Sequence, residues 1–378
     1  MTAASLDPPA AGRRSWRDRW RAFRNARLRS PAFQMWAARF PPTRPTALRN
    51  ARALFDLTAG FVYSQVLAAC VRLRLFDALA DAPLTTAQTA ARIGLSDEAA
   101  ERLLRAAASL DLTERCDDGR WTLGTLGAAM LGAPGVAEMV EHHAALYADL
   151  SDPVALLKAR GGRVGGFWSY SRNPAAGELT PDKVADYSAL MAASQQTFVA
   201  DVLAAWPFAR ARRLLDVGGG QGHFLRAVRA VAPRTELALF DLPGVAELAR
   251  GRFAAEGLQA EAHGGDFFAD ALPEGFDLIT LIRVCFDHDD EPCIRLLRAA
   301  RAALPPGGTL LVAETMAGTP GAEPVGDAYF GFYLLAMGSG RPRTAAELGA
   351  LLAAAGFGRV REMRTPRPML ARVLAAQA

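Results

Sequence analysis

A glycine-rich stretch that follows an apolar run constrains the fold of this chain more than any other feature. In "LLDVGGGQGHF", which begins at Leu214, the apolar run comes directly before the glycines, and a helical pattern follows them. Glycines allow the backbone to turn tightly and to approach a ligand without a side chain in the way. From about residue 212 onward, the apolar runs "ELALFDL", "DLITLI" and "GTLLVAET" alternate with further helical patterns. This alternation predicts an α/β fold in which a parallel sheet carries helices on both faces.

The spacing of the glycines restricts the ligand of this turn. A dinucleotide site requires the pattern G-x-G-x-x-G, and counting from Gly218 and Gly220 the third position is His223. A nicotinamide-dependent oxidoreductase is therefore excluded. What remains is an acid followed by alternating glycines, in which Asp216 precedes Gly218, Gly220 and Gly222.

Two further strand ends carry polar groups suited to a nucleoside. In "LFDLP" the carboxylate of Asp241 can accept hydrogen bonds from both ribose hydroxyls, unless it only caps the helix that begins at Pro243. In "GGDFF" Asp266 can accept from an adenine amino group, and Phe267 can cover the face of the ring. Three such segments without a pyrophosphate site predict S-adenosylmethionine as the cofactor. The predicted cofactor-binding residues are Asp216, Gly218, Gly220, Asp241, Leu242, Asp266 and Phe267.

Positive charge is concentrated at the N-terminus. The chain has a net charge of +4, but residues 1–50 alone carry +9, which leaves −5 for the remainder. Within this arm, "RRSWRDRWRAFRNARLR" places Trp16, Trp20 and Phe23 at helical spacing with arginines on the other faces. This pattern is typical of a basic amphipathic helix, which lies either on an anionic membrane surface or against the body of the protein through its aromatic rings. The prolines of "PPTRP" are expected to end the arm.

The segment after the arm reads as a helical dimerisation unit. "LFDLTAGFVYSQVLAACVRLRLFDALA" is helical but too apolar for a surface, which predicts burial against a partner or a second subunit. Next come a helix, a turn, a helix with Ser96 as its N-cap, and a hairpin with Asp118-Gly119 as a two-residue turn. This is the shape of a winged helix, but acidic residues such as Glu98 and Glu101 crowd its second helix and disfavour contact with nucleic acid. An oligomerisation scaffold is the better interpretation.

Other classes of protein are disfavoured by simple absences. No uninterrupted apolar run approaches the roughly 18 residues of a membrane-spanning helix, and no apolar signal-peptide core begins the chain, so a cytoplasmic protein is expected. The cysteines are widely spaced or match no common zinc motif, and histidines are few, which predicts reduced thiols and no metal. The four cysteines are Cys70, Cys116, Cys285 and Cys293.

From about residue 55 to the C-terminus the chain resembles the two-domain, S-adenosylmethionine-dependent O-methyltransferases of small molecules. The resemblance rests on "DVGGGQG", "FDLP", "GGDFF", "DHDDE", "LPPGGTLLVAE" and "AGF". It implies a Rossmann-like class I methyltransferase domain with an N-terminal α-helical, winged-helix-like dimerisation domain, and hence a homodimer. The domains expected are the arm at residues 1–46, the dimerisation domain at residues 47–160 and the methyltransferase domain at residues 161–378.

More narrowly, "LFDLTAGFVYSQVL", "VEHHAALYADLSDPVALLK", "GDAYFGFYLLAMGSGRPRT" and "RTPRP" resemble the 1-hydroxycarotenoid O-methyltransferases of purple bacteria. The resemblance implies methyl transfer to the tertiary 1-hydroxyl of an acyclic carotenoid of the demethylspheroidene or hydroxyneurosporene type. Since such a substrate resides in a bilayer, the arginine-rich arm would dock a cytoplasmic protein peripherally on the inner, photosynthetic membrane. No nucleic-acid partner is expected.

The stretch "RVCFDHDDE" departs from the wider family at the residue that matters most for the chemistry. Phe286 stands where the family has the histidine that takes the proton of a phenol, and His288 stands where it usually has tryptophan. Glu314 matches a glutamate that flanks that histidine, whereas the second flanking carboxylate falls at Pro342. Because Phe286 accepts no proton, the phenol mechanism does not carry over, and an alkyl alcohol is the expected acceptor. Glu314 and His288 are the candidate catalytic residues, with a strand-end cap and a structural histidine as their alternatives.

The resemblance also places the acceptor pocket. Its expected lining residues are Met191, Phe286, Phe330, Tyr333 and Met337. The last three are spaced three and four apart, so that one face of a helix can present them together, although such a stripe also suits plain core. His142 and His143 are adjacent on a helix and point in different directions, so at most one is expected to approach the acceptor hydroxyl.

Two other functions stay open at the level of sequence. Methylation at carbon on a bacteriochlorophyll-type tetrapyrrole also needs no phenol base. A non-catalytic winged-helix regulator that binds S-adenosylmethionine is the alternative from another class. An inactive enzyme is disfavoured, because the cofactor motifs would be expected to decay along with the missing histidine, and they are intact.

Overall fold

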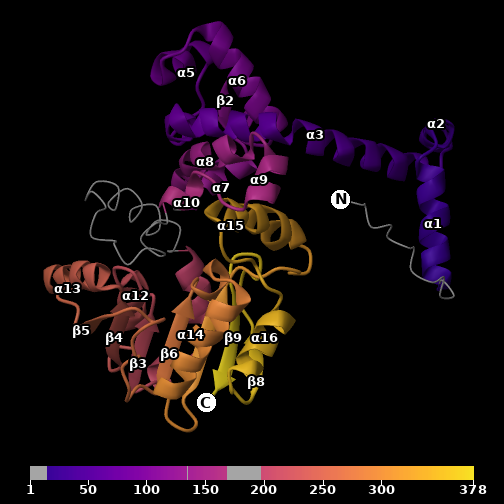
Figure 1. Cartoon of the computed structure of the whole chain (residues 1–378). Coiled ribbons are helices and arrows are strands. Elements are labelled where there is room, and N and C mark those ends of the chain that lie inside the picture. Colours follow the sequence, from indigo (N-terminus) through magenta and orange to yellow (C-terminus); the bar gives the residue numbers. More distant parts are fainter. Residues whose placement is uncertain (1–14, 134, 168–196) are drawn as a thin grey trace. The chain divides into compact units, whose positions relative to one another are not determined.

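The computed structural model describes residues 15–133, 135–167 and 197–378, and the chain divides into two compact units, residues 1–69 and residues 70–378 (Figure 1). The predicted domain boundaries at 46/47 and 160/161 are not tested by this division and stay predictions.

The first unit consists of helices. The predicted basic helix is α1 (Trp16–Leu28), followed by α2 (Pro31–Arg39), and each begins at a serine whose side chain accepts a backbone N–H in the first turn. The third helix, α3 (Arg44–Arg72), runs on into the second unit. Its bounds correct one expectation, because Pro45 lies in the first turn of α3, where a proline is well tolerated, rather than in a break between domains.

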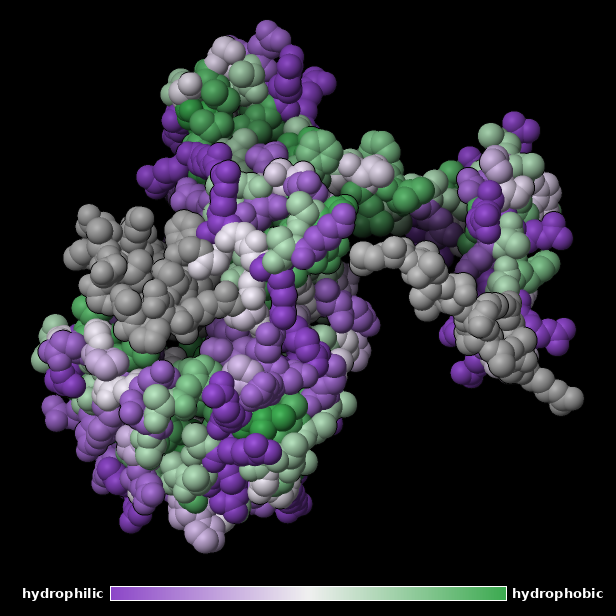
Figure 2. Space-filling model, in the orientation of Figure 1, coloured by the Kyte–Doolittle hydropathy of each residue, from purple (hydrophilic) through white to green (hydrophobic). Residues whose placement is uncertain are grey.

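Helix α3 is long and apolar along its exposed side. It has 29 residues and an 18-residue window of mean hydropathy 1.5, of which 11% is buried. Figure 2 shows this part of the chain as a mainly hydrophobic band. By length and composition alone the helix could cross a membrane. Its apolar residues are interrupted by polar ones, so it contains no uninterrupted apolar run of that length. A helix that is too apolar for solvent and has little of its apolar surface covered needs a partner.

The winged-helix prediction is confirmed. The second unit continues from the end of α3 with α4 (Leu75–Leu79), α5 (Thr86–Ile93), α6 (Asp97–Ser109), β1 (Thr113–Arg115), β2 (Trp121–Leu123) and α7 (Thr125–Leu131). Ser96 caps α6, as predicted, by accepting the N–H of Ala99 at 3.3 Å. The two-residue turn is wrong, since Gly119 donates its N–H to Cys116 and has φ 83°, which puts glycine at the end of a longer turn.

Three helices connect the winged helix to the rest of the second unit. They are α8 (Val136–Leu150), α9 (Pro153–Ala159) and α10 (Val164–Phe167). The last of these ends directly before residues 168–196, which are outside the described part of the chain.

The α/β fold is confirmed by a seven-stranded sheet in the order β5-β4-β3-β6-β7-β9-β8. Its strands are β3 (Arg213–Val217), β4 (Glu236–Asp241), β5 (Ala260–Gly264), β6 (Leu278–Ile282), β7 (Thr309–Glu314), β8 (Val360–Met363) and β9 (Arg372–Gln377). The sheet is mixed rather than wholly parallel, because β9 runs antiparallel to both β7 and β8. The four predicted runs all fall on parallel strands, and Gly264 of "GGDFF" ends the parallel strand β5, while Gly265 follows it.

Helices cover both faces of the sheet, as expected. One apolar cluster joins the strands to α14 (Asp290–Ala303) and α16 (Ala345–Ala354), and another joins them to α12 (His223–Val231) and α13 (Pro243–Glu256). The strand order reverses between β3 and β6, and ligands of open α/β sheets bind where the order reverses, beyond the carboxyl ends of the strands. This edge carries the predicted site.

Candidate active site

The glycine-rich turn after β3 has a backbone conformation that favours glycine. Gly218, Gly220 and Gly222 have φ values of 71°, 58° and 79°, a region that L side chains rarely adopt. A Cβ on Gly222 would lie 2.2 Å from the ring of Phe253, whereas a Cβ on Gly220 would meet nothing within 4 Å. The backbone is therefore packed tightly below the turn and open at Gly220, as a ligand-binding turn requires.

The carboxylate of Asp241 is held at the end of β4 by two backbone amides. Its two oxygens accept from the N–H groups of Gly220 and Leu242, both at 2.8 Å. Burial raises the pKa of Asp241 to about 6, although both hydrogen bonds oppose the shift. Leu242 thus contributes its backbone to the site, and the remaining lone pairs of Asp241 are available to a ligand.

Asp216 lies beneath the turn. It is 1% exposed and accepts from the hydroxyl of Thr280 at 2.6 Å through Oδ1. Its Oδ2 has no hydrogen-bond partner among the described residues, and burial raises its pKa to about 7. A buried carboxylate oxygen without a partner suits a site that a donor on a ligand completes.

The third strand end forms an aromatic group. The carboxylate of Asp266 accepts the N–H of Phe268 at 2.8 Å, so part of its capacity is used in its own turn. The rings of Phe267 and Phe268 meet edge to face, and the ring of His288 lies edge to face with both, at centroid distances of 5.7 and 5.0 Å. His288 is thus grouped with the residues predicted to hold adenine.

These three strand ends fit an adenosyl ligand. Gly220 leaves open space, and Asp241 presents a carboxylate. Asp216 has one carboxylate oxygen without a hydrogen-bond partner among the described residues, and Phe267 presents an aromatic ring. The roles of the predicted cofactor-binding residues stay predictions. Across the described ranges, no group of three or more His, Cys, Asp or Glu residues could hold a metal ion.

Phe286 and Glu314 meet at the other side of the strand ends. Phe286 is 3% exposed and belongs to η4 (Cys285–Asp287), the short helix after β6. Its N–H donates to Glu314 Oε2 at 3.0 Å, while Oε1 of Glu314 has no hydrogen-bond partner in the described part of the chain. Glu314 is fully buried, and burial raises its pKa to about 7. With this pKa the carboxyl is about half protonated at neutral pH. This protonation state is compatible with the predicted role as proton acceptor and with the alternative role as a strand-end cap.

The raised pKa of Glu314 makes stability depend on pH. Between its ordinary value of 4.5 and about 7, the unfolded chain releases a proton that the folded chain keeps, so the free energy of unfolding falls as the pH rises. Glu314→Gln removes this loss, and we expect the variant to gain stability over the wild type, by up to about 3 kcal/mol at pH 8. Denaturant unfolding at pH 4.5, 6 and 8 measures the gain. An equal difference at all three values would contradict it.

The predicted acceptor residues come together in one apolar cluster, hereafter the acceptor cluster. Its buried members are Leu146, Leu156, Val164, Phe286, Tyr333, Leu334, Ala336 and Met337, and Phe330 packs against them. Phe330 ends the π-helix η5 (Pro324–Phe330), and Tyr333 and Met337 lie on α15 (Gly331–Met337), which follows it directly. Met191 lies outside the described residues.

Both adjacent histidines of α8 reach this part of the molecule, and the expectation that at most one approaches the acceptor hydroxyl stays a prediction. His142 Nε2 lies 2.9 Å from the hydroxyl of Tyr333, and His143 Nε2 lies 2.8 Å from the hydroxyl of Tyr329. The two tyrosines are four residues apart, so that one helix turn presents both hydroxyls to the two neighbouring rings. Burial lowers the pKa of both histidines.

Residues 338–343, a loop after α15, hold η4 in place and were not singled out from the sequence. The guanidinium of Arg343 is fully buried and donates to the carbonyls of Cys285 and His288 and to the carboxylate of Asp290, at 2.7 to 2.8 Å. A Cβ on Gly340 would lie 2.1 Å from the carbonyl oxygen of Phe286. In the sequence this loop is "GSGRPRT". Its arginines resemble ordinary surface residues, because the sequence does not show the carbonyls and carboxylate that they contact. Pro342 lies on this loop, at the position without a carboxylate.

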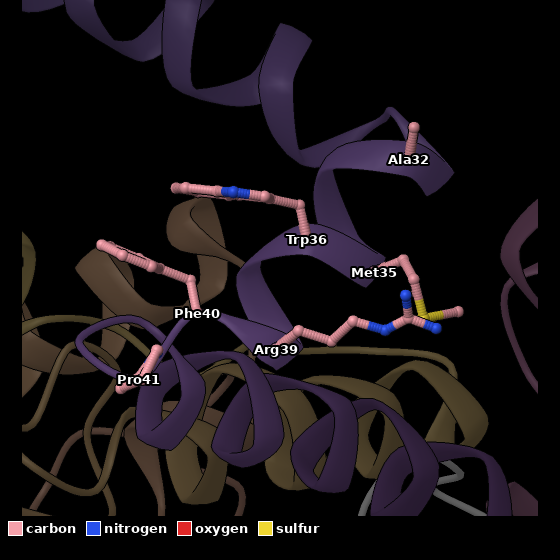
Figure 3. Close-up of a pocket in the computed structure, with 6 residues that line it drawn as sticks. All are labelled: Ala32, Met35, Trp36, Arg39, Phe40 and Pro41. Carbon is pink, nitrogen blue, oxygen red and sulfur yellow. The ribbon is translucent and has the colours of Figure 1, made fainter.

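A surface hollow in the first unit lies away from these residues in the sequence. It is lined by Ala32, Met35, Trp36, Arg39, Phe40 and Pro41. Figure 3 shows the rings of Trp36 and Phe40 side by side, and their centroids are 5.0 Å apart. It has one cation and no acid–base pair, so it offers an apolar surface rather than a catalytic site.

Two family profiles match this chain. An O-methyltransferase domain matches residues 147–358, and an O-methyltransferase dimerisation domain matches residues 55–132.

Named relatives agree with these profiles. Demethylspheroidene O-methyltransferase of Cereibacter sphaeroides is 44% identical over 350 residues, which cover 92% of each chain. Acetylserotonin O-methyltransferase of Mus musculus is 33% identical, covering 87% of this chain and 89% of the relative. Among solved structures, human N-acetylserotonin methyltransferase in complex with SAM has a TM-score of 0.71 at 25% identity, covering 87% of this chain and 97% of that one.

Proposed function

The chain belongs to the O-methyltransferases that carry a dimerisation domain, and from this membership we propose that it methylates the 1-hydroxyl of an acyclic carotenoid of the demethylspheroidene type. The methyl donor is S-adenosylmethionine, and the product is a 1-methoxy carotenoid. The observation that carries the proposal is the similarity to demethylspheroidene O-methyltransferase, which extends over nearly the whole of both chains.

The geometry around Phe286 supports an apolar acceptor. The residue at the usual position of the base is a buried phenyl ring, and its neighbours in the acceptor cluster are aromatic or aliphatic. The ring of Phe286 lies edge to face with that of Phe330, with centroids 6.0 Å apart. Such a surface accommodates a polyene by burial of apolar area and would leave a charged or strongly polar acceptor without partners.

An alkyl alcohol also changes what the site must do. A phenol has a pKa near 10 and gains rate from a base that removes its proton first. An alkyl alcohol is far less acidic, so its proton leaves during or after transfer, and positioning becomes the main contribution. S-adenosylmethionine supplies a methyl group on a positively charged sulfur. The residues of this chain hold the hydroxyl oxygen in line with that methyl group and exclude water, because an apolar surrounding favours a reaction that removes charge from the sulfur.

The enzyme is further proposed to be a homodimer in which α3 of one protomer packs against its partner. The exposed apolar side chains of α3 include Leu54, Phe55, Leu57 and Phe61, each at least 64% exposed. The dimerisation profile begins at residue 55, within this helix. A second copy of the chain therefore explains an apolar helix that could otherwise be assigned to a membrane.

The test of the function is transfer of a labelled methyl group. The full-length protein is incubated in liposomes with labelled S-adenosylmethionine and a 1-hydroxy acyclic carotenoid, and the matched control is the same polyene without the hydroxyl. We expect label in the hydroxylated carotenoid alone, as a methyl ether. Label in both polyenes would indicate methylation at carbon, and label in neither, with the cofactor bound, would exclude this acceptor.

We also propose that the arm docks the enzyme on the cytoplasmic face of the membrane that holds the carotenoid. None of the residues of α1 is buried, and Trp16 and Trp20 are 72% and 57% exposed. Arginines lie beside these rings, with the guanidinium of Arg17 5.6 Å from the ring of Trp16. Exposed aromatic rings among arginines suit an interface in which the rings enter the acyl boundary and the charges meet anionic headgroups.

Removal of the two tryptophans tests the docking. We expect Trp16→Ala with Trp20→Ala to weaken binding to phosphatidylglycerol vesicles about tenfold or more, because each large apolar side chain buried contributes on the order of 1.5 kcal/mol. Co-sedimentation measures the binding. The control is Leu126→Ala with Leu157→Ala, which removes two exposed side chains outside the arm. Equal losses in the two double variants would contradict the proposal.

A further inference from the structure

Two tyrosine–histidine pairs join α8 to the segment that carries Phe330. Tyr333 pairs with His142 and Tyr329 pairs with His143, and the two tyrosine rings stack with centroids 6.1 Å apart. Helix α15 packs on α8 (Figure 1), so the pair of Tyr333 joins these two helices, and the pair of Tyr329 joins α8 to η5, which directly precedes α15. Burying polar groups in apolar surroundings costs free energy unless each group keeps a hydrogen-bond partner. Two such pairs side by side therefore suggest a function beyond packing.

The pairs differ in what surrounds each hydroxyl. Tyr333 is a buried member of the acceptor cluster together with Phe286, and the ring of Phe330 contacts both, at 6.4 and 6.0 Å between centroids. The hydroxyl of Tyr329 donates to the sulfur of Met139 at 3.5 Å in addition to its contact with His143. Tyr333 is therefore the tyrosine that shares the buried surroundings of Phe286.

We propose that Tyr333 binds the acceptor hydroxyl and removes its proton, with His142 as the positioning residue that takes the proton from Tyr333. This inference rests on the proposed function. In the transfer, the sulfur–methyl bond breaks and leaves its electron pair on sulfur, while the acceptor oxygen forms a bond to the methyl carbon. The hydroxyl proton passes to the oxygen of Tyr333, and the proton of that tyrosine passes to Nε2 of His142. The tyrosine ends neutral, and the histidine holds the positive charge.

The protonation state of His142 suits this task. Burial lowers its pKa below 6.5, so the ring is neutral at pH 7 and can accept a proton. A weak base is sufficient, because an ether oxygen that has gained a methyl group and still carries its proton is a far stronger acid than imidazolium. The base can therefore act through the hydroxyl of Tyr333 instead of contacting the acceptor directly, as the missing histidine would.

Other ionisable groups lie on the elements around His142. His143 and Tyr329 lie beside it, and η5 adds Asp327, which is exposed and accepts from the N–H of Gly318. Burial and the neighbouring Tyr333 raise the pKa of Tyr329, and Arg283, which directly follows β6, opposes this shift. Of the helices that pack nearby, α9 has the exposed Lys158, and α10 has no charge. Helix α8 itself has Glu138, Glu141 and Asp149, and the last accepts the backbone N–H groups of Arg163 and Val164.

The two pairs provide matched variants for the test. With a 1-hydroxy acyclic carotenoid as acceptor, we expect Tyr333→Phe and His142→Gln each to lower kcat about 100-fold while KM changes little, the lower end of what a positioned acid–base group contributes. Glutamine keeps an acceptor for the tyrosine hydroxyl but takes no proton. The same changes in the other pair, Tyr329→Phe and His143→Gln, should lower kcat less than tenfold. Equal losses from both pairs would mean a structural role and overturn the proposal.

Three further readouts separate chemistry from folding. The kcat of the wild type should fall on the acid side of pH 6.5 as His142 gains a proton, and His142→Gln should lack this limb. His142→Ala should regain activity with added imidazole, which a merely structural role would not allow. Independently of activity, NMR titration should place the pKa of the His142 ring below 6.5, and Tyr333→Phe should shift it.

A wild type that fails to methylate the carotenoid contradicts the proposed function. A wild type that methylates the carotenoid while His142→Gln keeps full kcat contradicts this inference alone.

Discussion

Replacing Arg343 with methionine should lower the free energy of unfolding by about 3–5 kcal/mol, the range for breaking a buried charged contact. The guanidinium of Arg343 is completely buried and is the donor to two carbonyls of the turn that presents Phe286. Methionine fills much of the same volume but donates no hydrogen bond, so the carbonyls of Cys285 and His288 would each lose a donor. Because η4 would lose its shape, methyl transfer should be lost as well. Denaturant unfolding measures the stability.

Arg341 provides the matched control. It contacts the same carboxylate, that of Asp290, but its side chain is 43% exposed, whereas that of Arg343 is 0% exposed. Arg341 also pairs with Glu347 at 2.8 Å, and each exposed ion pair contributes at most about 1 kcal/mol, so Arg341→Met should lower the stability by no more than about 2 kcal/mol. If the two variants lost the same stability, the carboxylate of Asp290 and not the pair of carbonyls would be the important contact.

Changing Asp241 to asparagine should weaken the binding of S-adenosylmethionine about 10- to 100-fold. Asparagine has one acceptor oxygen, which is needed for the N–H of Gly220, and its amide group would face the N–H of Leu242. The ligand therefore loses a hydrogen bond to a charged acceptor, worth about 1.5–3 kcal/mol. Isothermal titration calorimetry with S-adenosylmethionine measures the affinity without any need for the acceptor.

Glu236 is the control for this experiment because it lies on the same strand at its other end. Its side chain is exposed and pairs with Arg213 at 2.9 Å. Glu236→Gln should leave the affinity within about twofold, since the position is remote from the carboxyl ends of the strands. An unchanged affinity in Asp241→Asn would mean that Asp241 serves only to hold the turn.

The sheet could be predicted from the sequence because local pattern determines it. The apolar runs that became β3, β4, β6 and β7 are bounded by glycine, proline or charge, and their order along the chain sets the parallel pairing. The antiparallel strand β9 is apolar like the parallel strand β7 beside it, and its residues alone do not determine its direction. The glycine-rich turn was predictable for a similar reason, since positive φ and close packing leave glycine little competition.

The acceptor side was predicted only in part, because its contacts join residues that are far apart in the chain. The pairing of His142 with Tyr333 spans 191 residues, and the three donors of Arg343 reach back more than 50 residues. A histidine or arginine has the same appearance in the sequence whether it is solvated or buried with partners. Phe330, Tyr333 and Met337 could be named in advance because their spacing of three and four already placed them on one helical face.

The measurement that tests the central claim most directly is the ratio of kcat/KM for a 1-hydroxy acyclic carotenoid to kcat/KM for a catechol-type phenol. It is determined for the wild type and for Phe286→His, which supplies the base that the phenol reaction uses. We expect the wild type to favour the carotenoid by about 100-fold or more, the lower end of the contribution of a missing general base, and the variant to lose most of this preference. A wild type that prefers the phenol, or a ratio that Phe286→His leaves unchanged, would contradict the account of Phe286 as an adaptation to an aliphatic hydroxyl.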